Sequence, residues 1–269
     1  MNTDRQFATT LARGLEILRC FTPEKPSLGN RELSDITGFP KPTISRFTYT
    51  LSTLGYLRID HDTGKYSLGT AILTLSYPLL ANIPLRQLVR FPMRYLADKI
   101  GGSVSLGMRD RLSIVYVETS RSKSLQAQQY SDIGMSHPII GTANGRAYLA
   151  ACTPEDRKAL LNEIRIKTPD QWEKFGARAM TMIEEWKTLG FCYSYAEYRP
   201  DVCTVGVPYR HQGVLGDLFV FNCVLSSHLV KPGQLENEVG PQLLEMVNSL
   251  RNFEVGQTFL RASYQGAGN

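Results

Sequence analysis

The stretch NRELSDITGFPKPTISRFTYTLSTLGYL, residues 30–57, decides how the first part of this chain folds. Asn30 is expected to cap a short helix that ends at Gly38, because glycine adopts the left-handed conformation most easily. A second helix is expected to start near Pro42, since the first helical turn tolerates the proline ring. Two short helices joined by a tight turn predict a helix-turn-helix, whose second helix can enter the major groove of DNA.

The two faces of this second helix differ in chemistry. Ile44, Phe47, Leu51 and Leu54 recur at helical spacing and are expected to pack inward. The opposite face is polar, and no acidic residue occurs between Asp35 and Asp60. Hydroxyl, basic and tyrosine side chains suit contacts with phosphates and base edges, although a plain solvated face is the alternative. The predicted DNA-binding residues are Lys41, Pro42, Thr43, Ser45, Arg46, Tyr49, Arg58, His61 and Lys65.

The flanking segments complete a small domain. Upstream, Thr9 or Thr10 is expected to cap a first helix whose inner face carries Leu11, Leu15 and Leu18. Downstream, alternating apolar and polar residues on both sides of residues 61–64 predict a two-stranded hairpin. Three helices followed by a hairpin predict a winged helix-turn-helix domain over residues 1–69.

The remaining residues predict a linker and a larger domain. Residues 70–84 are expected to form a linker helix that stops or kinks at Pro78. The next helix carries Arg86, Arg90 and Arg94 on one face, which is expected to be solvated, with DNA flanks or a second subunit as the alternative contact. Strands are predicted over 103–108, 112–119, 193–195, 203–209 and 216–225, with a turn at 211–213, and helices over 142–152, 154–164, 170–189 and 233–253. Antiparallel strands with helices packed on them predict an α+β domain over residues 85–269.

Composition limits the class of protein. A chain of 269 residues, 42% of them hydrophobic, is long enough for two domains with separate cores. It has no apolar run that could span a bilayer and no apolar core of a signal peptide, so we expect a cytoplasmic protein without a membrane partner. Five dispersed cysteines and four dispersed histidines predict neither a disulfide framework nor a metal site, and we expect no cofactor. The net charge of +5 is compatible with a nucleic-acid partner.

Six stretches carry a family resemblance: LARGLEIL at 11–18, NRELSDITGFPKPTISRF at 30–47, LGYL at 54–57, KYSLG at 65–69, HPIIGTANGRAYLA at 137–150 and GFCYSYAEYRPDVCTVGVPY at 190–209. They resemble the IclR (isocitrate lyase regulator) family of bacterial transcription factors over nearly the whole chain. The LARG start is most similar to the branch that controls aromatic-acid catabolism. The resemblance implies a GAF-like C-terminal domain that binds an effector, and homodimers that can pair into homotetramers.

A ligand site is predicted where Gly141 to Gly145 open a helix, because the N–H groups and the positive dipole end there suit a carboxylate. The resemblance implies a small organic acid, including aromatic acids, as effector, and a facing wall built by residues 203–209 and 220–225. A buried amide needs a hydrogen-bond partner, which favours Asn144 and Asn222 as ligand contacts. For the cysteine and valine candidates, core packing is the alternative role. The predicted effector-binding residues are Thr142, Ala143, Asn144, Gly145, Ser194, Glu197, Cys203, Thr204, Asn222 and Val224; the carboxylate of Glu197 would repel an acid unless it is paired.

The predicted function is therefore sequence-specific DNA binding, with a small organic acid altering operator binding or promoter activation. Reading a palindromic operator in double-stranded DNA requires two recognition helices, so we expect at least a dimer. Two alternatives stay open. A hydrolase could use the same pocket, although GxSxG, HExxH, CxxC, GxGxxG and P-loop motifs are all missing from the sequence, which argues against an enzyme. A winged helix that contacts proteins instead of DNA would have the same pattern.

Overall fold

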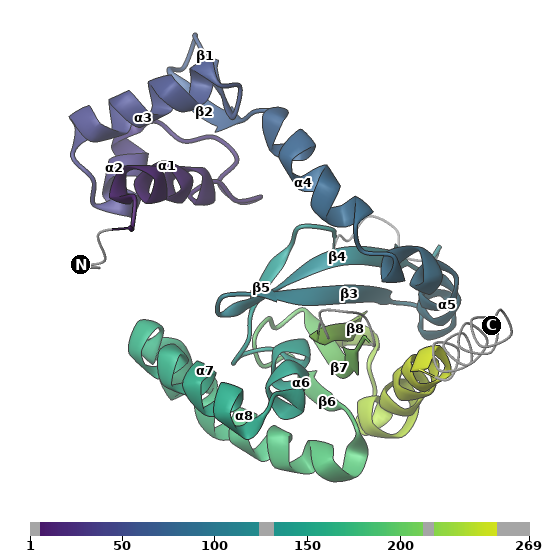
Figure 1. Ribbon diagram of the computed structural model, residues 1–269. Coiled ribbons are helices and arrows are strands. Elements are labelled where there is room, and N and C mark those ends of the chain that lie inside the picture. The colour runs from purple at the N-terminus through teal and green to yellow at the C-terminus, as the bar shows by residue number, and fades with distance from the viewer. Residues whose placement is uncertain (1–5, 124–131, 212–217, 252–269) are drawn as a thin grey trace, which may run out of the picture. The chain divides into compact units, whose positions relative to one another are not determined.

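The computed structural model describes residues 6–123, 132–211 and 218–251. The chain divides into two compact units, Met1–Ile83 and Pro84–Asn269 (Figure 1). Part of the predicted turn at 211–213 and the end of the predicted helix at 252–253 lie outside the described residues. The elements of the first unit are α1 (Thr9–Arg19), α2 (Asn30–Thr37), α3 (Lys41–Thr53), β1 (Leu57–Asp60), β2 (Lys65–Leu68) and α4 (Ala71–Ala81).

The helix-turn-helix forms as predicted, but its first caps differ. Gly29 is the N-cap of α2, and its N–H donates to Glu32 Oε2 at 2.8 Å. Asn30 lies inside the helix because its side chain bonds across to α3, accepting from Thr48 Oγ1 and donating to Ser45 Oγ, both at 3.3 Å. Likewise the N-cap of α1 is the residue before Thr9, so the predicted caps at Thr9 or Thr10 and at Asn30 are wrong. The predicted left-handed stop of α2 at Gly38, with φ 70°, is confirmed.

The core of the first unit is small. Its buried residues are Ile17, Phe21, Leu28, Leu33, Ile44 and Leu57. Leu11, Leu15 and Leu54 are exposed, so the prediction that they face inward is wrong. In α1 it is Ile17, not the leucine stripe, that reaches the centre, because three short helices around so small a core cannot cover every apolar position.

The wing is closed by its own acidic residue. β1 and β2 pair antiparallel with Asp60 opposite Lys65. The Asp60 carboxylate accepts from Thr63 Oγ1 at 2.8 Å and from the Asp62 N–H at 3.0 Å, and these bonds lower the pKa of Asp60. Two backbone bonds of 2.9 Å between Leu28 and Tyr66 fasten the hairpin to the loop that precedes α2. The wing is thus a fixed part of the unit.

The linker helix α4 continues through Pro78 to Ala81, so of the two predicted outcomes at this proline, a stop or a kink, the stop is wrong. The carbonyl of Pro78 accepts from the Asn82 side chain at 2.8 Å, which helps to end the helix one turn later. No residue of α4 is buried.

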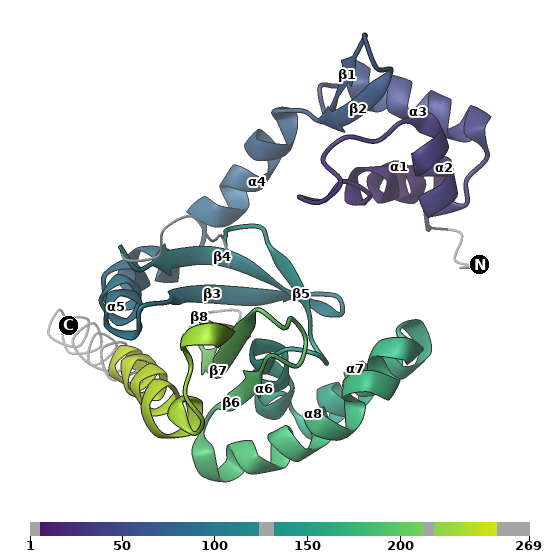
Figure 2. The ribbon, with the colours of Figure 1, turned by 180° about the vertical axis from the view of Figure 1, so that it is seen from behind.

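The second unit is an antiparallel sheet with helices on both faces (Figures 1 and 2). The strand order is β5-β4-β3-β8-β7-β6. Its elements are α5 (Leu85–Ile100), β3 (Ser103–Asp110), β4 (Ser113–Arg121), β5 (Ser136–Pro138), α6 (Ala143–Ala151), α7 (Pro154–Lys167), α8 (Pro169–Leu189), β6 (Cys192–Tyr195), β7 (Val202–Arg210) and β8 (Leu218–Ser226). A 3₁₀ turn, Ser227–Leu229, follows β8. A π-helical turn, Leu235–Val239, then continues as a helix over 240–251. The α+β prediction is confirmed; β5, with three residues, is too short for alternation to predict.

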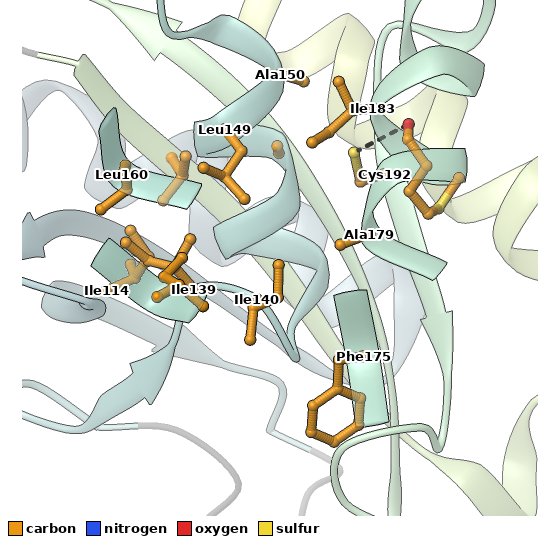
Figure 3. Close-up of a cluster of buried hydrophobic side chains, with 14 of the residues drawn as sticks. Ile114, Ile139, Ile140, Leu149, Ala150, Leu160, Phe175, Ala179, Ile183 and Cys192 are labelled. Atoms are coloured by element: carbon orange, nitrogen blue, oxygen red, sulfur yellow. Dashed lines mark hydrogen bonds between the residues drawn. The ribbon is translucent and has the colours of Figure 1, made fainter. Parts of the chain in front are cut away.

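The interior on the α6 face is apolar. α6 packs on β7 and β8, and α8 packs on α6. Figure 3 shows the resulting cluster, in which α6, α7 and α8 contribute Leu149, Leu160 and Ile183. The thiol of Cys192 donates to the Met182 carbonyl at 3.8 Å within it. Among the described residues no helix is long and apolar enough to cross a membrane.

A β-bulge fixes α5 to the other face. Leu106 pairs with Glu118 whereas Gly107 pairs with Tyr116, so one extra residue on β4 turns Glu118 away from α6 and towards α5. There Glu118 Oε2 lies 3.1 Å from Arg86 Nη2 and 3.2 Å from Arg90 Nε. The prediction of a solvated arginine face is therefore wrong for Arg86, which is nearly buried against β4, whereas Arg90 and Arg94 are exposed.

The Glu118 cluster makes a stability prediction. The side chains of Glu118 and Arg86 are only 8% and 13% exposed, so Glu118→Gln leaves a nearly buried guanidinium without its counter-charge. We expect the free energy of unfolding of the second unit to fall by roughly 3 kcal/mol. Urea unfolding followed by tryptophan fluorescence measures it, because both tryptophans, Trp172 and Trp186, lie on α8.

Arg90 supplies the matched control, since its side chain is 60% exposed. Arg90→Ala should lower the free energy of unfolding by less than about 1 kcal/mol. Equal losses in Glu118→Gln and Arg90→Ala would contradict the importance of the buried Arg86 pair.

Candidate ligand pocket and nucleic-acid interface

A cavity of about 30 Å³ that is partly open to solvent lies at the N-terminus of α6. Its floor is formed by alternate residues of two paired strands. These are Val202 and Thr204 on β7 and Asn222 and Val224 on β8, and Thr204 pairs with Val224. The complete lining is Tyr116, His137, Thr142, Asn144, Ser194, Tyr198, Arg199, Val202, Thr204, Asn222 and Val224. The cavity therefore has mixed polar, aromatic and aliphatic walls.

The predicted effector residues fall into two groups. Those that line the cavity are Thr142, Asn144, Ser194, Thr204, Asn222 and Val224. Ala143, Gly145, Glu197 and Cys203 do not line it, and their assignment to effector binding stays a prediction. Cys203 points to the opposite face of β7 from Thr204, because side chains alternate along a strand.

Ala143 and Gly145 instead form a backbone contact that holds α6 in place. A Cβ added to Gly145 would lie 2.1 Å from the Ile139 carbonyl oxygen, and one added to Gly206 of β7 would lie 2.7 Å from the Ala143 carbonyl carbon. Only glycine at 145 and 206 permits this approach. The N-terminus of α6 is thereby pressed against the sheet at the edge of the cavity.

The first turn of α6 is capped from its own sequence. Thr142 Oγ1 accepts from the Gly145 N–H at 3.3 Å and donates to the Pro138 carbonyl at 2.8 Å. Asn144 Oδ1 also accepts from the Gly145 N–H, at 3.0 Å. The positive end of the helix dipole at the cavity favours a ligand with negative charge.

Glu197 is paired, which removes the expected repulsion of an acid. Its Oε2 lies 2.8 Å from Nη2 of the fully buried Arg146, and its Oε1 lies 3.6 Å from Arg178 Nε. Arg146 Nε also donates to the Ile140 carbonyl at 3.2 Å. The bend that carries Tyr198 and Arg199 is therefore fastened to α6 by an ion pair.

Sequence reasoning missed several lining residues, namely Tyr116, His137, Tyr198, Arg199 and Val202. Val202 could have been found by alternation with Thr204, since period two places both on one face. His137 and Tyr198 come from distant segments, with ring centroids 6.5 Å apart. Only the tertiary fold brings them together.

His137 is uncharged at neutral pH. Burial, and to a smaller extent the positive charge of Arg199, lower its pKa to about 4. Its ring lies beside Tyr116, with centroids 5.2 Å apart. A neutral imidazole can both donate and accept a hydrogen bond, so His137 gives the cavity a polar side chain that carries no charge. Arg199 also lines the cavity, but its guanidinium is paired with the Asp201 carboxylate, through Nε to Oδ1 at 3.0 Å and through Nη2 to Oδ2.

In the first unit, the predicted DNA-binding residues lie on α3 and the wing. On α3, Lys41, Pro42, Ser45, Arg46 and Tyr49 are exposed and Thr43 is half-buried. Arg58 and His61 are exposed on the wing. Lys65 forms an ion pair with Glu32 Oε2 at 3.2 Å, so its ammonium already has a partner in α2. Among the described residues, no group of three or more His, Cys, Asp or Glu side chains could hold a metal ion.

Comparisons with known proteins give one consistent result. The family model described as IclR helix-turn-helix domain matches residues 10–61, and that described as bacterial transcriptional regulator IclR C-terminal matches residues 78–215. The HTH-type transcriptional regulator TsaQ1/TsaQ2 of Comamonas testosteroni is 34% identical over 243 residues, which are 90% of this chain and 87% of that protein.

Solved structures agree with this. A crystal structure of an IclR family transcriptional regulator from Brucella abortus is 40% identical, has a TM-score of 0.81, and covers 93% of this chain and 94% of its own. The fold is shared, at 17% identity and a TM-score of 0.62, with an IclR homolog from Microbacterium hydrocarbonoxydans complexed with 4-hydroxybenzoate; the match covers 89% of this chain and 99% of that one.

The lowered pKa of His137 predicts a pH dependence. Between pH of about 6.5 and about 4 the unfolded chain binds a proton at this residue that the folded chain does not, so stability falls as the pH falls through this window. From pH 7 to 4 we expect wild type to lose up to about 3 kcal/mol more than His137→Gln in free energy of unfolding. Parallel urea titrations across this pH range measure the difference; identical pH profiles would contradict the prediction.

Proposed function

Because the chain belongs to the IclR family of bacterial transcriptional regulators, we propose that it binds a palindromic operator as a dimer and that a small organic acid in the α6 cavity alters this binding. The chain is a DNA-binding regulator and not an enzyme, which removes the hydrolase and protein-contact alternatives. The observation that carries the proposal is the exposed polar face of α3, held in place by a buried inner face.

We assign the reading of DNA to that face. Arg46 and Tyr49 are one helical turn apart, and Tyr49 is among the most exposed large side chains of the unit. The guanidinium of Arg46 can bridge O6 and N7 of a guanine, and small neighbours such as Ser45 let the helix approach the base edges. The wing residues Arg58 and His61 lie within reach of the phosphate backbone in this arrangement.

The exposed linker helix supports the proposed dimer. α4 has no charged residue and no buried residue, although Leu73, Leu75, Tyr77 and Leu79 are all exposed. A helix that is apolar on every side is stable in water only when another surface covers it. The occupant we propose is the same helix of a second copy, because a palindrome is read by two recognition helices related by a two-fold axis.

The cavity suits an acid with an apolar body. The positive end of the α6 dipole attracts a carboxylate, and the rings of Tyr116, His137 and Tyr198 with Val202 and Val224 can enclose the rest. The homolog complexed with 4-hydroxybenzoate has the same fold, which supports an aromatic acid as one candidate. Such a ligand changes operator binding only if it binds two arrangements of the dimer with different affinity.

Arg46 provides a direct test of DNA reading. We expect Arg46→Ala to weaken binding to the operator by roughly 1–3 kcal/mol. Arg46→Lys is the matched control, because lysine keeps the charge but loses the bidentate geometry. If Arg46 reads guanine, lysine should leave the salt dependence of binding unchanged and reduce discrimination between operator and random duplex. Full discrimination in Arg46→Lys would assign Arg46 to a phosphate, and wild-type affinity in Arg46→Ala would remove it from the interface.

The dimer can be tested on α4. Tyr77→Glu places a charge in the proposed interface, which we expect to raise the dimer dissociation constant at least about tenfold. Ile166→Glu is the matched control, because Ile166 on α7 is equally exposed, at 70%, and lies in the other unit. Sedimentation equilibrium measures both. A dimer that tolerates Tyr77→Glu as well as Ile166→Glu would contradict the assignment of α4.

A further inference from the structure

The side chain of Asn30, the first residue of α2, is hydrogen-bonded to two residues of α3. Its Nδ2 donates to Ser45 Oγ, and its Oδ1 accepts from Thr48 Oγ1, both at 3.3 Å. Thr48 is fully buried, whereas Ser45 lies on the exposed polar face of α3. Residues three apart are neighbours on one side of a helix, which allows a single amide to reach both. Asn30 therefore connects the inside of the unit to the face that we assign to DNA.

Thr48 anchors this amide from below. Its hydroxyl also lies 3.0 Å from the Ile44 carbonyl oxygen and 3.2 Å from that of Ser45, so it is held against the backbone of its own helix. A hydroxyl that is buried and bound in this way has a fixed position. With Oδ1 of Asn30 directed to Thr48, Nδ2 is directed to Ser45.

The bond from Asn30 determines what Ser45 can offer to DNA. The Ser45 oxygen accepts from Asn30, which leaves the hydroxyl hydrogen available for an acceptor. A freely rotating hydroxyl can donate or accept, so it does not discriminate between bases. In the major groove guanine, adenine and thymine all present acceptors, whereas cytosine presents only a donor. An oriented donor therefore distinguishes cytosine from the other three bases at one position of a strand.

We infer that Asn30 is a positioning residue for DNA reading, which orients the Ser45 hydroxyl as a hydrogen-bond donor to a base edge. The inference rests on the proposed function, because it deepens the reading of DNA by the same helix face. It concerns the preference among bases, whereas overall affinity depends mostly on contacts with phosphates. The two quantities can be measured separately.

Selection from a library of randomised DNA duplexes tests the inference on the full chain without a known operator. We expect Ser45→Ala to lower the preference at the base pairs that Ser45 contacts by about threefold to tenfold. Asn30→Ala should lower it at the same base pairs by a similar factor. Combining the two substitutions should cause no further loss at these positions, because both remove one contact.

Asn30→Asp isolates the donor. Aspartate has the shape of asparagine and keeps the acceptor for Thr48, but it cannot donate to Ser45. We expect it to lower the same base preferences as Asn30→Ala. Its negative charge weakens binding to every duplex, and this effect cancels in the relative preference.

Ser34→Ala is the matched control. Ser34 is also on α2, but its hydroxyl donates to the Phe39 carbonyl in the turn, at 2.7 Å. The variant thus loses a hydrogen bond of the same helix and keeps the link to Ser45, so every wild-type base preference should remain. A partly unfolded variant binds all duplexes less, so relative preferences report on Asn30 even where stability falls.

The outcomes separate the inference from the proposed function. Wild-type preferences in Asn30→Asp, or equal losses in Ser34→Ala and Asn30→Ala, would overturn the inference. Unchanged preferences in Ser45→Ala would also overturn it, since Ser45 would then contact no base. All three results leave sequence-specific binding in place. If wild type enriches no sequence from the library, the proposed reading of an operator fails, and the inference fails with it.

Discussion

A single buried guanidinium holds the walls of the α6 cavity together. Arg146 is fully buried inside α6, and its only carboxylate partner among the described residues is Glu197, on the bend after β6. The pair joins the helix whose N-terminus faces the cavity to the segment that supplies Tyr198 and Arg199. It also neutralises a carboxylate that would otherwise weaken the binding of an anion. A charge in such a place is tolerated only while its partner stays, so both walls of the cavity are positioned by one interaction.

The rest of the second unit adjusts to this arrangement. The close backbone approach at Gly145 and Gly206 sets the height of α6 above the sheet. Because of the bulge in β4, Tyr116 points to the cavity whereas Glu118, two residues later, points to α5. Hydrogen-bonding chemistry for a ligand and charge pairing for the fold thus lie two residues apart on the same strand without competing.

Local signals in the sequence were sufficient for the helix-turn-helix. Gly38 and Pro42 determine the backbone conformation of their own helix ends, so their effects can be predicted without knowledge of the tertiary fold. The sequence was insufficient wherever a side chain acted across elements. Asn30 looked like a cap but bonds to α3, and the arginines of α5 looked solvated because nothing local reveals a bulge in β4. In the cavity, the family resemblance pointed to Thr204 and a buried-amide argument favoured Asn222, whereas the contributions of His137 and Arg199 depend on contacts that only the folded chain makes.

The glycine contact between α6 and β7 also limits how such a site can diversify. A side chain at Gly145 or Gly206 would collide with backbone, which cannot move aside as a side chain can. New ligand shapes must therefore be accommodated elsewhere, by exchanges at Val202, Thr204 and Val224, where the lining consists of side chains alone. Descendants of this protein could change the shape of the cavity by altering its sheet side, while the position of α6 stays as it is.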